Sequence, residues 1–87
     1  MKYKTIPGVV ITSVCDRYFL VSTKETMQIN ETTAFYWRIL EKGATVKDLY
    51  EKAVIYYDVE DPEVLRGDIR ELVDSLLAKH LLVRWAS

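Results

Sequence analysis

Residues 27–37 read MQINETTAFYW, and the residue pattern changes its period in the middle of this stretch. Residues 27–29 alternate apolar and polar side chains, as a half-buried strand does. Asn30 is a strong helix N-cap residue, and from Glu31 onward the apolar spacing is helical. The stretch therefore predicts a short strand that runs directly into a helix, and the free edge of that strand is a candidate for function.

The size and composition of the chain indicate one soluble domain spanning residues 1–87. The sequence is 49% hydrophobic and 29% charged, which is typical of a globular protein rather than a disordered one. The net charge of −1 gives no overall basic field that would attract nucleic acid. No apolar run reaches the roughly 18 residues of a membrane span, and residues 1–8 lack the apolar segment of a signal peptide. We expect a cytoplasmic protein that does not contact a membrane.

The order of the predicted elements indicates the α+β class. Two β-branched runs, at residues 9–14 and 17–22, precede the short strand at residues 26–29, and the loops between them are too short for crossovers. The sequence therefore predicts a three-stranded antiparallel sheet followed by three helices, with a winged helix-turn-helix-like shape. The helices are expected at residues 31–41, 46–57 and 62–79, and residues 81–83 could leave the last helix as a short extended tail.

Two features of the helices leave alternatives open. Phe35, Tyr36 and Trp37 are consecutive and point about 100° apart, so either the first helix is covered on two sides or one aromatic ring is exposed. Gly67 lies inside the third helix, where it marks either the close approach of another backbone or an exposed position.

Catalytic and metal-binding patterns are nearly absent from the sequence. His80 is the only histidine and falls near a helix C-terminus, where a capping role is ordinary. Cys15 is the only cysteine, so the sequence offers too few ligands for a structural zinc site and no support for a Cys–His pair. No phosphate-binding glycine motif is present. We therefore predict a protein that is not an enzyme and has no catalytic residue, metal or cofactor.

Two binding functions remain on the residues alone. A winged-helix DNA-binding protein would place the third helix in the major groove, but that helix region carries five acidic and three basic residues, and phosphates repel such a surface. A peptide-binding module would use the edge strand at residues 26–29, which another chain can extend through its backbone groups. The alternative for that strand is an inert edge blunted by Lys24 and Glu25.

Two longer stretches carry a resemblance to a known family. Residues 29–46, INETTAFYWRILEKGATV, resemble the LN…IW.LL.G.T signature of the PqqD-like family, which comprises small domains that bind the leader peptides of ribosomally made natural products. In residues 45–83 the positions Asp68-Ile69, Leu72-Val73, Leu76 and Leu81-Leu82 fall in register with the family pattern DV..LL..L…GLL. His80 stands where the family has a glycine, so a residue that tolerates a positive φ less well must take the helix cap.

The resemblance implies a three-stranded sheet packed on three helices and binding without catalysis. It implies that a precursor leader peptide adds as a strand to residues 26–29 and packs its apolar side chains against the third helix. The domain would then present the precursor to a modifying enzyme, often of the radical-SAM type, or to a leader peptidase. The implied peptide-binding residues are Thr26, Met27, Gln28, Ile29, Leu65, Asp68, Ile69 and Leu72.

Several alternatives remain open at this point. Leu65, Ile69 and Leu72 also lie in the apolar arc of the third helix, so the protein's own core is their alternative place. The stretch VSTKETMQIN at residues 21–30 lacks the Pro-Glu pair of PqqD proper, which favours a peptide system other than pyrroloquinoline quinone. The exposed edge could also pair with a second copy in a homodimer, and the aromatic first helix could dock on an enzyme. If a peptide adds to the edge, Met27→Pro is expected to abolish its binding.

Overall fold

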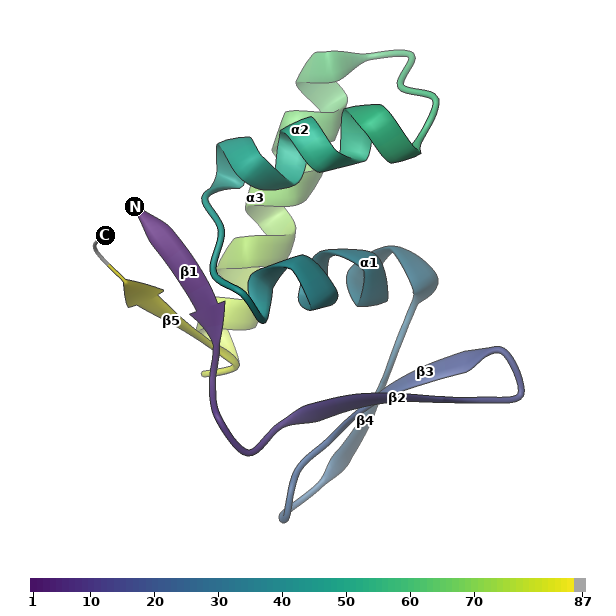
Figure 1. The fold of residues 1–87 in the computed structure, drawn as a ribbon, viewed down its shortest axis with the longest axis vertical. Coiled ribbons are helices and arrows are strands. Elements are labelled where there is room, and N and C mark those ends of the chain that lie inside the picture. Colours follow the sequence, from purple (N-terminus) through teal and green to yellow (C-terminus); the bar gives the residue numbers. More distant parts are fainter. Residues whose placement is uncertain (86–87) are drawn as a thin grey trace.

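The structure is a computed structural model that describes residues 1–85. It confirms the expected α+β class, with a three-stranded antiparallel sheet and three helices, and adds a second sheet (Figure 1). The elements run in the order β1 Lys2–Thr5, β2 Val10–Val14, β3 Arg17–Val21, β4 Thr26–Ile29, α1 Glu31–Leu40, α2 Val46–Tyr56, α3 Pro62–Ala78 and β5 Leu82–Trp85.

Two tight turns fold β2, β3 and β4 into the expected meander, in the order β2-β3-β4. Cys15 and Asp16 both have positive φ angles, of 52° and 63°, which is the backbone of a two-residue turn that matches the twist of a hairpin. In the next turn, Ser22 N–H donates to the Glu25 carbonyl at 2.9 Å. Within residues 1–85, β4 pairs only with β3, so its other edge is open.

The first and last segments of the chain pair with each other, which the sequence did not predict. β1 and β5 form an antiparallel ladder from Lys2↔Trp85 to Thr5↔Leu82, so the expected extended tail after α3 is a strand. Tyr3 also exchanges two backbone hydrogen bonds with Ala44, at 2.8 and 2.9 Å. The short charged stretch KYKT carries little strand signal of its own, and its partner lies at the far end of the sequence. This pairing is set by tertiary contacts rather than by local pattern.

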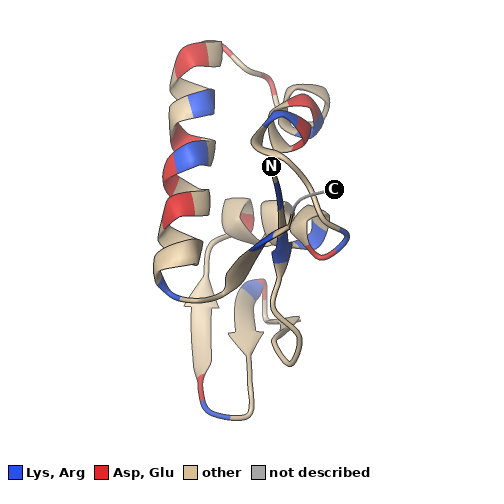
Figure 2. Ribbon diagram, turned by 90° about the vertical axis from the view of Figure 1, so that its left-hand side faces the viewer, with Lys and Arg blue, Asp and Glu red and all other residues tan. Residues whose placement is uncertain are grey.

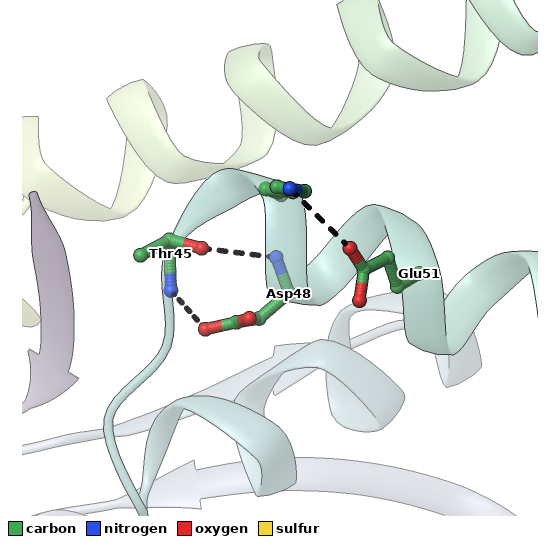
Figure 3. Close-up of polar contacts among 4 residues, drawn as sticks. Thr45, Asp48 and Glu51 are labelled. Carbon is green, nitrogen blue, oxygen red and sulfur yellow. Dashed lines mark hydrogen bonds and ion pairs between the residues drawn. The ribbon is translucent and has the colours of Figure 1, made fainter.

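Capping explains where α1 and α2 begin. The Asn30 side chain accepts a hydrogen bond from Thr33 N–H at 2.7 Å, as expected. Thr45 and Asp48 form a reciprocal capping box: Asp48 N–H donates to Thr45 Oγ1 and Thr45 N–H donates to Asp48 Oδ2, both at 3.0 Å (Figure 3). The backbone hydrogen bond from Thr45 is also the main reason why the pKa of Asp48 is lowered from 3.8.

Both ends of α3 are capped, the first by a side chain and the last by backbone geometry. Asp61 accepts hydrogen bonds from the N–H groups of Glu63 and Val64, and Pro62 occupies the first turn. At the other end, His80 has φ of 59°, and Leu81 N–H donates to the Leu76 carbonyl at 2.9 Å. This is a Schellman-type cap with histidine at the position that glycine usually takes.

The core lies between the three-stranded sheet and the helices. Its largest fully buried side chains are Trp37, Leu40, Leu49, Ile69 and Val73. Gly67 has no atom near its missing side chain, so its place is the exposed one. At Gly43, by contrast, φ is 86° and the Trp85 ring lies 2.7 Å from where a Cβ would sit, so only glycine fits there.

Candidate functional site

The open edge of β4 presents backbone groups in a fixed alternation. Ser22 and Glu25 are bonded through Ser22 N–H, and in an antiparallel ladder hydrogen-bonded pairs alternate with non-bonded ones. With the register Leu20↔Met27, the backbone groups of Met27 therefore point toward β3. Those of Thr26 and Gln28 point outward to the open edge. A proline at Met27 would therefore remove a donor of the ladder to β3, and the residue whose outward donor a proline removes is Gln28.

The side chains of β4 alternate in the same way between the core and the solvent. Met27 and Ile29 are half-buried and pack against the core, whereas Thr26 and Gln28 are exposed. A chain added to this edge would follow the same pleat, so every second side chain of it would face the helices. The edge of β4 therefore has free backbone groups for a further strand, and the side chains of such a strand would alternate between the helices and the solvent.

Helix α3 lies on the same side of the molecule as β4, at the rear of the view in Figure 1 and at the left in Figure 2. Leu65 and Leu72 are half-buried and pack at the margin of the core, and Asp68 is exposed. The three residues are spaced at i, i+3 and i+7 and so form one stripe of the helix. Ile69 is fully buried, so its side chain lies in the core, which was the alternative left open for it.

A cavity of about 440 Å³ lies between the start of α1, the α2–α3 loop and the first half of α3. Leu65 and Asp68 of the expected site line it, and none of the four β4 residues does. We call it the acidic cavity because four carboxylates and no basic side chain line it, namely those of Asp58, Glu60, Asp61 and Asp68. The remaining lining residues are Thr32, Tyr36, Tyr57, Val59 and Val64.

Two tyrosines of the acidic cavity have raised pKa values. For Tyr36, burial raises the pKa of the hydroxyl above 10.0, with smaller contributions from Tyr57 and Asp68. For Tyr57, burial is again the first cause, followed by the charge of Glu31. Both phenols therefore stay neutral at physiological pH and can donate a hydrogen bond to a ligand or accept one from it.

A second hollow, of about 410 Å³, lies on the other side of Tyr57. We call it the basic cleft because three cations, Arg38, Lys42 and Lys52, line it against one carboxylate, Glu31. Its apolar wall is made by four residues, Phe35, Ile39, Tyr56 and Tyr57, and Tyr18 of β3 completes the lining. The rings of Phe35, Tyr56 and Tyr57 pack edge-on or tilted, with centroids 4.9 to 5.2 Å apart.

Sequence reasoning found the edge strand and the α3 stripe but missed the rest of the lining. Asp61 caps α3, and Asp58, Glu60 and Asp61 all line the acidic cavity. Tyr36 lies in the core with 3% exposure and also lines the cavity. A signal was available: four carboxylates within residues 58–63 exceed what one helix cap needs.

The family of the chain follows from a comparison of its sequence with family models. Residues 17–82, well over half of the chain, match the model of coenzyme PQQ synthesis protein D (PqqD). The chain belongs to the PqqD family. Comparison with curated protein sequences gives no significant match.

Three solved structures share the fold of this PqqD-family chain. The complex of TbiB1 with the TbiA(beta) leader peptide has a TM-score of 0.78 at 23% identity, over 97% of this chain and 99% of that one. A lasso peptide synthetase B1 complexed with its leader peptide has a TM-score of 0.76 at 21% identity, over 94% and 98%.

The third is the PqqD truncation of Methylobacterium extorquens PqqCD, a functional and stand-alone recognition element for ribosomally synthesized and post-translationally modified peptides. Its TM-score is 0.79 at 19% identity, over 95% of this chain and 89% of that one. Together the three likenesses establish the PqqD fold.

Within residues 1–85, no group of three or more histidine, cysteine or acidic side chains is placed to hold a metal ion. None of the helices in that part of the chain is long and apolar enough to cross a bilayer.

Proposed function

We propose that this PqqD-family protein binds the leader segment of a ribosomally made precursor peptide. The observation that carries the proposal is the open edge of β4, where the N–H and C=O groups of Thr26 and Gln28 point outward. The strand itself lies on the same side of the molecule as α3. A leader peptide would add to this edge as a further strand and complete the ladder. The match to the PqqD family, and two structural neighbours that are complexes with leader peptides, support the proposal.

Side-chain selection would come from the face that Met27 and Ile29 share with α3. The stripe from Leu65 to Leu72 covers seven residues of helix, about 10 Å, which is the length of roughly three residues of extended peptide. Apolar leader side chains at alternate positions would pack on the half-buried leucines. Thr26, Met27, Gln28 and Ile29 would supply the strand, and Leu65, Asp68 and Leu72 the facing wall, with Ile69 supporting it from the core.

The bound precursor would then be presented to a separate enzyme, of the radical-SAM type or a leader peptidase, because the domain supplies recognition and not chemistry. Pairing of two β4 edges in a homodimer would compete with peptide binding, since both use the same backbone groups. The alternative of a winged-helix DNA-binding protein stays a prediction, and duplex DNA is its direct probe. An enzyme that docks on α1 independently of any leader peptide is a further alternative, which a pull-down without peptide would test.

The test is a titration of the nitrogen-15-labelled protein with leader peptides from short open reading frames encoded nearby. We expect saturable amide shifts at residues 26–29 and along α3. Gln28→Pro should weaken binding about tenfold or more, because it removes an outward donor and places a ring at the edge. Met27→Pro is the wrong probe, since it breaks the ladder to β3.

Ser13→Pro is the matched control for the edge substitution. By the same alternation, the backbone groups of Ser13 point outward from β2, on the opposite edge of the same sheet. Ser13 is exposed, as Gln28 is. We expect this variant to bind the leader as the unmodified protein does. A folded Gln28→Pro variant with unchanged affinity would overturn strand addition at β4.

A further inference from the structure

The basic cleft is a hollow that strand addition at β4 does not use. Its lining comes from α1, the α1–α2 loop, the second half of α2 with Tyr57, and Tyr18 of β3, and it contains no residue of β4 or α3. A leader strand paired with β4 would therefore leave the cleft free. The one salt bridge within residues 1–85 lies elsewhere on α2. The three exposed cations of the cleft, Arg38, Lys42 and Lys52, are thus available to carboxylates of a partner.

Apolar side chains lie beside these cations and are open to solvent. Ile55 and Tyr56 are 83% and 70% exposed near the end of α2. The Tyr56 ring packs on Phe35 with centroids 4.9 Å apart, which positions the ring and leaves most of its surface free. Tyrosine and arginine are the residue types that most often dominate binding at protein interfaces. The cleft therefore has the composition of a contact surface, and its charges are not simply a solvated cluster.

The basic cleft continues into a second hollow along the groove between α1 and α2. The second hollow has a volume of about 330 Å³, shares Ile39 and Lys52 with the basic cleft, and is also lined by Ile55. At the other end of the groove, the Arg38 guanidinium lies over the Tyr18 ring, 5.6 Å from its centroid, which favours one position for this cation. Two adjoining hollows accommodate a short segment of chain rather than a single ion.

We propose that the basic cleft is a docking surface for the modifying enzyme, and that its occupant is an acidic segment of that enzyme with at least one bulky apolar side chain. This inference rests on the proposed function for the identity of the partner. Carboxylates of the segment pair with Arg38 on α1 and Lys52 on α2, and the apolar side chain packs on Tyr56. Leader and enzyme then occupy different surfaces of one small domain at the same time.

The chemistry of the cleft is tested with acetyl-Glu-Phe-Glu amide, compared with acetyl-Gln-Phe-Gln amide, which has nearly the same shape and no charge. The nitrogen-15-labelled protein is titrated to about 50 mM, which saturates a site of millimolar affinity. We expect saturable amide shifts at residues 35–42 and 52–57 with the acidic tripeptide, and at least about fivefold weaker binding of the neutral one. Equal binding of the two, or no shift with the acidic tripeptide, would overturn the inference.

Two variants and one control locate the tripeptide. Lys52→Gln removes a charge at an exposed position, and Tyr56→Ala removes the exposed ring. Each should weaken binding of the acidic tripeptide by about threefold or more. Lys79→Gln makes the same change of charge at the end of α3, outside the cleft, and should leave the affinity unchanged. If Lys79→Gln weakened binding as much as Lys52→Gln does, binding would follow net charge and the assignment to the cleft would be wrong.

The source of the acidic segment is tested with the radical-SAM enzyme or leader peptidase encoded nearby. Isothermal titration calorimetry of that enzyme should show binding about threefold or more weaker with Lys52→Gln than with Lys79→Gln. Binding should also weaken when the salt concentration rises from about 50 to about 500 mM. Equal affinity of the two variants would overturn docking of the enzyme at the cleft.

The remaining occupant is a second copy of this chain, whose acidic residues 58–63 offer the complementary charge. Sedimentation equilibrium of the protein alone should therefore give a monomer. A dimer that Lys52→Gln dissociates would overturn the assignment of the cleft to the enzyme.

Failure of this inference and failure of leader binding are distinguishable. Because no residue of β4 lines the cleft, Gln28→Pro should not change the affinity for the acidic tripeptide, and Lys52→Gln should not change the affinity for a leader peptide. If leader peptides bind and respond to Gln28→Pro while the two tripeptides bind equally, the docking surface is wrong and the proposed function stands. If the acidic tripeptide is selected and no leader peptide binds, the docking surface is present and strand addition is wrong. A leader peptide that Lys52→Gln weakens would put the leader in the cleft and overturn the assignment to the enzyme.

Discussion

The acidic cavity and the basic cleft are similar in volume and share Tyr57, yet they are opposite in charge and different in composition. The acidic cavity takes its charge from the α2–α3 loop and α3, whereas the basic cleft takes its charge from α1, the α1–α2 loop and α2. The net charge of −1 conceals this division. Two hollows within one small fold are therefore lined by side chains of opposite charge.

The three consecutive aromatic residues of α1 lie in three different environments. Phe35 lines the basic cleft, Tyr36 lines the acidic cavity, and Trp37 is fully buried in the core. The alternative of one exposed ring is wrong, because Phe35 is half-buried and Tyr36 and Trp37 are buried. A single helix thus sends neighbouring side chains into three different environments.

The largest expected effect comes from removing the ring that lies in the core. Trp37→Ala should lower the free energy of unfolding by about 3–5 kcal/mol, because it deletes the largest fully buried side chain. Phe35→Ala should cost about 1–2 kcal/mol, because Phe35 is half-buried and its loss opens only the basic cleft. Urea unfolding followed by far-ultraviolet circular dichroism measures both, independently of the lost tryptophan fluorescence. An equal loss of unfolding free energy in the two variants would contradict the assignment of Trp37 to the core and of Phe35 to the margin.

The fold was predictable wherever the decisive interactions are local. Asn30, Thr45 and Asp61 are residues of N-cap type beside helical patterns, and each accepts a hydrogen bond from a backbone N–H group of its helix. The pairing of β1 with β5 was not predictable, because its partners lie at opposite ends of the chain and only tertiary packing brings them together. His80 shows the same contrast: its position in the cap followed from the family pattern, although its residue type argued against a positive φ.

The parts of the candidate site that lie within a single strand or helix were predictable from residue periodicity. Alternation at residues 26–29 and the apolar arc of α3 indicated an edge and a wall. The lining of the acidic cavity comes from α1, the α2–α3 loop and α3 together, so no single period contains it. The direction of each β4 backbone group depended on the register with β3, which the sequence did not specify.

A smaller effect tests whether α2, which ends just before the Tyr57 shared by both hollows, is positioned by its N-terminal cap. Thr45→Ala should lower the free energy of unfolding by about 1 kcal/mol, because it leaves a helix N–H group without its partner. Lys47→Ala, which removes only the exposed ion pair with Glu51, should change it by less than about 0.5 kcal/mol. Near-ultraviolet circular dichroism should stay unchanged in both, since Tyr56 and Tyr57 lie at the other end of α2. A changed aromatic spectrum in Thr45→Ala would show that the cap sets the shape of both hollows.

The smallest expected effect separates burial from charge within the acidic cavity. The pKa of Tyr36 is raised above 10.0 first by burial and only then by Tyr57 and Asp68. As the pH rises above 10.0, the unfolded chain releases this proton before the folded protein does, so the free energy of unfolding falls with pH in that range. In an alkaline titration of phenolate absorbance, Tyr36→Phe should remove part of the signal that rises last. Asp68→Asn should move that signal only slightly to lower pH, because burial remains; a large move would mean that the carboxylate, and not burial, governs the hydroxyl of Tyr36.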